Sequence, residues 1–410
     1  MKLPNSILVF AMLVSCPGAF AQADESPSPE QSPNIHSFAT KPEGAVLPEK
    51  VIRVRYIYTK VSGQGNGYDS TGGKTIAPLD LSLKAGAIVL EYGLTPELSL
   101  QFLQNFVTGY DLRTNSDRAL DYTADTRSKL RSQFKALICA GLKVPDTSCD
   151  AAVAQPPSAS IAAALNASSA VQGQAPGISF DASNPIATTI SNYVDAATLR
   201  QVGSAEASGA RGLGGAEVAF LWSPQSQGPL RFSVGSGFRI PMNKDLAAQG
   251  ESSITRDVPE FGLRTNIDYL PMESLALGWQ NQAEAGIASG KYKIGGTDAT
   301  FSRKGLRNVG FLLIKPSVAG FHESLKIFGP KLGIKYDYGN ERYIKLGSAD
   351  TVSIGPRGHE YKYYAGLYID FFSYSLPLQM ELEYEKSFKG KNVAVATDTS
   401  QLQLKGFYLF

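Results

Sequence analysis

Apolar and polar residues alternate along this chain in stretches long enough to form strands. Between residues 376 and 388, apolar side chains take every second position except 386, and three of the positions between them are glutamates. The apolar set is Leu378, Met380, Leu382 and Tyr384, and the acidic set is Glu381, Glu383 and Glu385. A β-strand has a side-chain period of two, so this segment predicts a strand with one apolar and one acidic face.

Twelve segments repeat this alternation, some less cleanly than others. They are 50–62, 80–92, 97–108, 214–223, 229–240, 257–270, 274–287, 305–320, 325–338, 359–373, 377–389 and 399–410. Several are longer than the ~5–6 residues of an ordinary soluble strand and suit the tilted strand of ~9–11 residues that crosses a membrane.

The connections between these segments alternate in length. Short ones (94–97, 223–228, 270–274, 321–324, 374–378) alternate with long ones (63–79, 109–213, 241–256, 288–304, 339–358, 390–398). Outer-membrane barrels have short turns on the periplasmic side and long loops outside. We therefore predict an all-β fold: a transmembrane antiparallel up-and-down β-barrel of about 12 strands over residues 50–410. A large soluble sandwich or propeller is the alternative, and it does not account for the two loop lengths.

The polar faces carry many charged residues, which decides how the strands are oriented. A lysine or arginine at the bilayer midplane costs about 2–4 kcal/mol, so a one-residue slip in register would be prohibitive. The polar faces should look into the lumen. The inward candidates are Arg53, Arg55, Arg231, Arg239, Arg264, Lys335, Asp268, Asp370, Glu381, Glu383 and Glu385.

These inward charges suggest a binding or selectivity site. The first and last strands pair in a closed barrel, so Glu381–Glu385 should lie near Arg53 and Arg55. We expect a basic wall that faces an acidic wall across a constriction, which would select small solutes. The alternative is that the ion pairs only brace the interior.

The N-terminus has the features of a secretory signal peptide over residues 1–21: Lys2, an apolar run from Ile7 to Val14, and a small-residue cleavage site at 19–21. A lipoprotein cleavage box ending at Cys16 is the alternative. Residues 22–49 are rich in Pro and Ser and predict a periplasmic linker, or else a plug within the lumen.

The connection 109–213 is rich in Ala and Ser and contains segments with helical spacing. By the topology above it is an extracellular insert. We expect it to fold over the barrel mouth as a surface loop, or to act as a lid or cap that captures a ligand. Cys139 and Cys149 are an even pair in an exported chain, which predicts a disulfide worth about 3 kcal/mol; two free thiols are the alternative.

Composition argues against other classes of function. The net charge of +2 gives no general attraction to nucleic acid, and no metal-ligand spacing or nucleotide fingerprint is present, so no cofactor is expected. The chain has three histidines, of which His359, next to Glu360, is the plausible general base of an outer-membrane enzyme. We predict a protein that is not an enzyme and keep a lipid-modifying enzyme as an alternative.

Several stretches carry a resemblance to a known family. The last strand ends at Phe410, which resembles the terminal signal read by the barrel-assembly machinery. The stretches "EGAVLPEKVIRVRYIYTK", "YDSTGGK" and "LEYGLTPELSLQF" resemble Gram-negative transporter-like proteins related to the meta-pathway of phenol degradation, within the superfamily of long-chain fatty-acid and hydrocarbon outer-membrane transporters.

The resemblance implies a barrel in the outer membrane of a Gram-negative bacterium. Its partners would be outer-membrane lipid and a small, possibly hydrophobic, solute that it passes or captures, and we expect a monomer. The alternative is a structural or adhesive barrel with a closed lumen, in which the extracellular insert does the binding.

Overall fold

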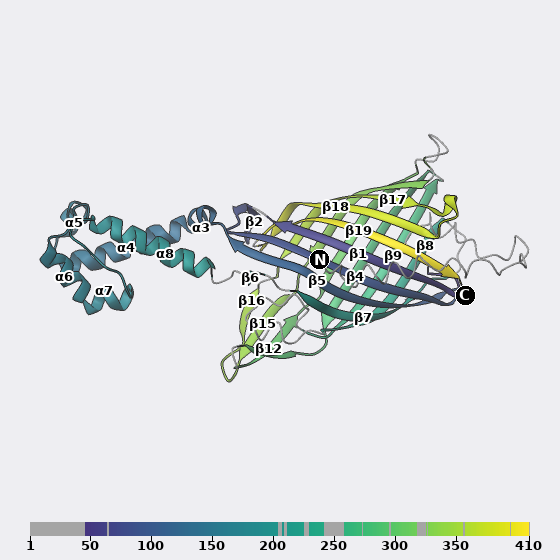
Figure 1. The fold of residues 1–410 in the computed structure, drawn as a ribbon, viewed down its shortest axis with the longest axis horizontal. Coiled ribbons are helices and arrows are strands. Elements are labelled where there is room, and N and C mark those ends of the chain that lie inside the picture. The colour runs from purple at the N-terminus through teal and green to yellow at the C-terminus, as the bar shows by residue number, and fades with distance from the viewer. Residues whose placement is uncertain are drawn as a thin grey trace, which may run out of the picture.

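Twelve long strands close into one antiparallel barrel in the computed structural model of the chain (Figure 1). The structure describes residues 46–409 except 64, 204–206, 209–210, 225–228, 242–257, 273, 295–296, 318–324, 326, 356 and 394. The predicted signal peptide with Cys16, most of the 22–49 segment and Phe410 lie outside the described residues.

The strands of the barrel follow one another around the ring in chain order, and the last one pairs with the first. They are β1 (Val51–Gly63), β4 (Leu79–Thr95), β5 (Leu98–Thr114), β7 (Gly212–Trp222), β8 (Leu230–Ile240), β9 (Glu260–Met272), β10 (Leu275–Gly286), β13 (Arg307–Pro316), β14 (Phe328–Tyr338), β17 (His359–Asp370), β18 (Leu378–Lys391) and β19 (Asp398–Leu409). Val51 lies opposite Leu409 in the pair that closes the ring. The predicted all-β barrel and its twelve strands are confirmed.

The alternating faces also lie as predicted. On β18 the outward residues Leu382 and Tyr384 are 42% and 45% exposed, whereas the inward residues Glu381 and Glu385 are 0% and 5% exposed. Exposed Leu, Val, Phe and Tyr side chains recur on the outward faces of the other strands. An apolar exterior around a charged interior is the inverse of a soluble protein and typical of a membrane barrel.

The two ends of the barrel differ, and we name them by their connections. The short-turn end holds the tight links, including the 3₁₀ turn η3 (Phe372–Tyr374), and both ends of the barrel sequence. The long-loop end carries the hairpin of β2 (Asn66–Tyr68) and β3 (Lys74–Ile76), the short β6 (Ala207–Ser208), and a separate sheet. That sheet is made of β11 (Gly290–Ile294), β12 (Thr297–Lys304), β15 (Glu341–Leu346) and β16 (Val352–Gly355).

Helices fill the insert between β5 and β7. They are α3 (Ser116–Tyr122), α4 (Ala124–Gly141), α5 (Asp146–Val153), α6 (Ala159–Ala167), α7 (Ser169–Gln174) and α8 (Ile186–Gly203). They bury a core of their own, which includes Ile138, Ile190 and Val194. The predicted disulfide joins Cys139 on α4 to Cys149 on α5, with the two Cα atoms 5.8 Å apart.

The insert does not fold over the barrel mouth. Figure 1 shows α4 and α8 side by side in a rod that extends away from the barrel at the long-loop end. The prediction of a covering loop or cap was therefore wrong in its placement. Among the residues described, no helix has the length and apolar character needed to cross a membrane.

Ion pairs hold the rod together. Asp195 on α8 accepts hydrogen bonds from Arg127 and Arg131 on α4, the former at 2.8 Å. Burial raises the pKa of Asp195, but the two arginines outweigh this and hold that pKa below its ordinary value. At the base of the rod, Arg118 of α3 pairs with Asp80 of β4.

Candidate functional site

Inward side chains divide the lumen into two levels. Along β9 the inward positions run from Glu260 near the long-loop end through Arg264 and Asn266 to Asp268 near the short-turn end. Glu260 belongs to a dense group of ion pairs, which we call the ion-pair cluster. Arg264 and Asn266 line an open space that we call the lumen cavity. Asp268 lies beside this cavity, because it pairs with the lining residue Lys315.

The ion-pair cluster is centred on Arg239 of β8. Its guanidinium donates to Glu284 at 2.6 Å and to Glu217, and lies 3.6 Å from Glu260. Further members extend the group: Arg303 of β12 donates to Glu260 at 3.0 Å, and Arg307 of β13 lies 3.3 Å from Glu284 and 2.9 Å from Asp337.

The centre of the cluster is buried. Among the residues that the structure describes, three arginines meet four carboxylates, and Glu260 and Glu284 are only 1% and 2% exposed. Buried charges persist only when they are paired and hydrogen-bonded. The short ion pairs of the cluster therefore stabilise the charged groups on the inward faces of β7, β8, β9 and β10.

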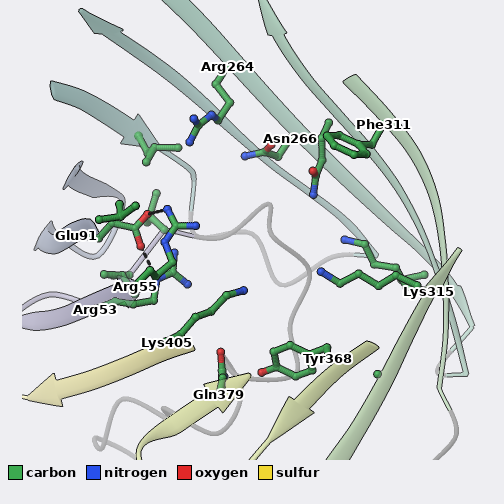
Figure 2. Close-up of a pocket in the computed structure, with 18 of the residues that line it drawn as sticks. Arg53, Arg55, Glu91, Arg264, Asn266, Phe311, Lys315, Tyr368, Gln379 and Lys405 are labelled. Atoms are coloured by element: carbon green, nitrogen blue, oxygen red, sulfur yellow. Dashed lines mark hydrogen bonds and ion pairs between the residues drawn. The ribbon is translucent and has the colours of Figure 1, made fainter. Parts of the chain in front are cut away.

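The lumen cavity lies next to the cluster, toward the short-turn end, and has a volume of about 770 Å³. Six cationic side chains line it, and Glu91 is the acidic one among its lining residues. The cations are Arg53, Arg55, Arg264, Lys315, Lys331 and Lys405. Figure 2 shows Arg53, Arg264, Lys315 and Lys405 approaching the same space from different sides of the barrel.

Carboxylates within the described part of the chain pair with several of these cations. Arg53 and Arg55 share Glu91, with the Arg55 contact at 3.0 Å. Lys331 and Lys405 likewise share Glu381, with the Lys405 contact at 2.6 Å. Each of these two carboxylates thus contacts two cations.

Arg264 differs from the other cations of the cavity. It donates to the neutral amide oxygens of Gln101 at 3.1 Å and Gln282 at 3.3 Å, while its contact with the carboxylate of Glu217 is 3.9 Å long. Its guanidinium is thus held in position mainly by neutral partners. It keeps more of its charge available to a ligand than a cation in a short ion pair does.

The rest of the cavity wall combines neutral polar side chains with apolar ones. Ile57, Leu103, Val309 and Phe311 contribute side chains between the cations, and Lys335 lies over the Phe311 ring at 5.2 Å. The site thus combines cationic groups with an apolar surface, which suits a ligand that has both characters.

The start of the described chain also lines the cavity. Val46 and Leu47 are buried there, and the Leu47 amide donates to Ser99 Oγ at 2.9 Å. Gly93 makes room for this segment, because a Cβ at that position would overlap the Pro48 carbonyl oxygen. These residues are the described end of the predicted 22–49 segment, and they lie inside the barrel.

The remaining predicted residues line the interior or lie beside it. Lys335 donates to both oxygens of Glu385, at 2.8 and 2.9 Å, and Lys315 pairs with Asp268 at 2.9 Å. Glu383 accepts from Tyr364 at 2.7 Å, and Asp370 accepts from the Phe372 amide at 2.9 Å.

Arg231 lies opposite Asp268 in the strand register. The constriction between a basic and an acidic wall stays a prediction. In the contacts described, inward basic and acidic side chains pair with one another.

Sequence reasoning missed several residues that form the site. Glu91 and Lys405 both fall on inward positions of strands that were predicted, so strict alternation along "VLEYG" and "QLQLKGF" would have found them. Arg303 could not be found in this way, because it reaches Glu260 from β12, outside the barrel wall.

His359, the candidate base of the enzyme alternative, lies in an aromatic group. Its ring stacks on Tyr338 with centroids 5.2 Å apart, and meets the edge of Tyr361 at 5.7 Å.

Comparison with known proteins identifies the fold. No protein-family model matches the chain, and no curated protein matches it in sequence. An outer membrane channel from Pseudomonas putida F1 aligns with a TM-score of 0.53 at 10% identity, over 89% of this chain and 98% of that one. The chain shares the barrel fold of that channel.

More distant structures align over similar lengths. The beta domain of the Bordetella autotransporter BrkA gives a TM-score of 0.34 at 9% identity, over 87% of this chain and 99% of that one. The CymD monoaromatic hydrocarbon channel gives 0.32 at 9% identity, over 89% and 90%. The resemblance to outer-membrane barrels is thus confirmed for the fold. This conclusion rests on the channel from Pseudomonas putida F1.

Proposed function

We propose that this chain is a monomeric outer-membrane channel that takes small organic anions with an apolar body into its lumen. The observation that carries the proposal is the lumen cavity of about 770 Å³, whose lining, among the residues described, has six cationic side chains and one acidic side chain. No cofactor and no catalytic step are part of the proposal.

The exterior supports placement in a membrane. Leu, Val, Phe and Tyr side chains are exposed around the barrel, and such a surface is costly in water but matched by lipid. The neighbour from Pseudomonas putida F1 is described as an outer membrane channel, which agrees with this placement.

The cavity supports the choice of solute. An anion would interact favourably with Arg264, whose donors are held by neutral amides and not by a short ion pair. Rings of cationic side chains select anions in pores. An apolar body on the solute would contact Leu103 and Phe311.

The test uses ions that cannot cross the bilayer unaided. Proteoliposomes holding the full chain are challenged with benzenesulfonate and with benzyltrimethylammonium, an anion and a cation of similar shape. We expect faster entry of the anion. Arg264→Gln should reduce that preference by roughly tenfold, the scale of a lost charge-assisted hydrogen bond.

The control is Arg113→Gln, which removes an arginine that is 73% exposed at the end of β5. It should leave the preference unchanged. Absence of any flux would contradict the channel, and equal entry of the two ions, or no effect of Arg264→Gln, would contradict the anion preference.

A second candidate function concerns the helical rod. Its separate core, its disulfide and its projection from the barrel favour binding to another surface outside the cell. In that case, deletion of residues 115–211 would abolish surface binding while the barrel still folds.

A further inference from the structure

Five lysines lie on the outward face of adjoining strands near the long-loop end. They are Lys60 on β1, Lys84 on β4, and Lys386, Lys389 and Lys391 on β18. All five are exposed. The strands β18, β19, β1 and β4 are neighbours on one side of the barrel (Figure 1), and we call the five lysines on them the outer lysine patch.

The strand register shows that these lysines point outward. Lys60 lies opposite Ser400 and Lys84, two positions beyond the outward Tyr58. Lys386 lies opposite Tyr363, which is 58% exposed on the exterior. The lysines therefore continue the apolar outward faces of their strands beyond the point where apolar residues end.

The lysines of the outer lysine patch differ from the inward lysines in their contacts with described residues. Across the residues that the structure describes, none of the five lysines forms an ion pair, whereas the inward Lys331, Lys335 and Lys405 each meet a carboxylate. Asp398, on the strand between β18 and β1, instead accepts hydrogen bonds from Tyr384 and Ser387.

Two of the lysines oppose each other directly. Lys60 and Lys84 occupy the same register position on paired strands, and like charges placed in this way are destabilising. An anion bound between the two ammonium groups would remove that repulsion.

Aromatic side chains mark the level of the patch relative to the membrane. Phe388 stacks on Tyr363 with centroids 4.2 Å apart, and Tyr361 lies 6.4 Å from Phe388. Outward aromatic residues collect at the boundary between lipid tails and headgroups. Lys389 and Lys391 follow Phe388 along β18, so they reach the level of the headgroups.

We propose that the outer lysine patch binds the phosphate groups of a lipid in the leaflet at the long-loop end. Phosphate is the strongly anionic group found at this depth, and it accepts hydrogen bonds from several ammonium groups at once. The inference rests on the membrane placement in the proposed function and is independent of the solute.

The experiment measures lipid binding to the full chain in neutral detergent. Lipid A, which carries two phosphates, and the same lipid with both phosphates removed are titrated, and bound lipid is counted by native mass spectrometry. We expect preference for the phosphorylated form. The triple variant K386Q/K389Q/K391Q should bind it about tenfold or more weakly, and K60Q/K84Q should also weaken binding.

The control variant K129Q/K291Q removes two exposed lysines elsewhere and should bind like the wild type. A heat-dependent shift on detergent gels verifies that each variant forms the folded barrel. If the triple variant does not fold, Lys389→Gln alone is tested, and it should weaken lipid binding about fivefold. Equal binding of both lipid forms, unchanged binding by the variants, or equal loss in the control would overturn the inference. Loss of solute flux with lipid binding intact would overturn only the anion channel.

Discussion

The ion-pair cluster and the lumen cavity are built from the same kinds of residue, but they pair them differently. In the cluster, Arg239 meets three carboxylates, and Arg303 and Arg307 reach two of them from other strands. In the cavity, Arg53 and Arg55 share Glu91, and Arg264 is held mainly by the neutral amides of Gln101 and Gln282. The comparison shows that short ion pairs engage the charge of Arg239 within the protein, whereas Arg264 keeps more of its charge available to a ligand.

The largest expected effect comes from breaking the cluster with Arg239→Met. Three carboxylates would lose their shared partner inside the barrel, and uncompensated buried charge costs about 3–5 kcal/mol. The free energy of unfolding, measured by urea titration in lipid vesicles, should fall by that amount. Arg113→Met is the control, because that arginine is exposed. An unchanged stability would mean that the cluster is not a balanced, desolvated unit.

A smaller effect is expected from Gly93→Val, which acts at the short-turn end of the cavity. The added side chain would overlap Pro48 and displace Val46 and Leu47 from the lumen, at a cost of about 1–3 kcal/mol. Benzenesulfonate entry should become faster because the cavity widens. Gly109→Val, where an added Cβ would meet the flexible Lys84 side chain at 4.0 Å, should change neither quantity. Slower entry would show that the segment does not restrict the cavity.

The smallest effect is expected from Glu91→Gln, which sharpens the contrast in charge. Removing the acidic lining residue adds one positive charge to the cavity, so the preference for benzenesulfonate over benzyltrimethylammonium should rise about twofold to threefold. The direction is opposite to that of Arg264→Gln. A fall in the preference for benzenesulfonate would contradict the proposal that positive charge on the cavity wall selects anions.

The strands could be predicted well from the sequence because the alternation of apolar and polar residues within each strand is enough to identify it. Alternation along 377–389 needs no knowledge of the neighbours, and it placed Glu381 and Glu385 inward and Leu382 outward, as the structure has them. The lengths of the connections then distinguished the two ends of the barrel.

Partners across the lumen could not be predicted in the same way. Which inward residues meet depends on strand tilt and stagger, which shift the levels of neighbouring strands relative to one another. Thus Lys331 of β14 reaches Glu381 of β18, two strands away, and Arg53 meets Glu91 of the adjacent β4. The direction in which the rod extends could not be predicted either, because it depends on tertiary contacts at its base, such as that of Arg118 with Asp80.

The seam between β1 and β19 has a consequence for biogenesis. Val51 pairs with Leu409, so the backbone groups on that side of β1, the first strand of the wall, stay unsatisfied until β19, the last strand of the wall, has been made. In the hydrocarbon core of a membrane, each unsatisfied backbone N–H or C=O group costs several kcal/mol. An incomplete barrel is therefore strongly disfavoured there. Insertion should therefore be all-or-none, and a chain that stops short of residue 398 would leave two open edges and no stable wall.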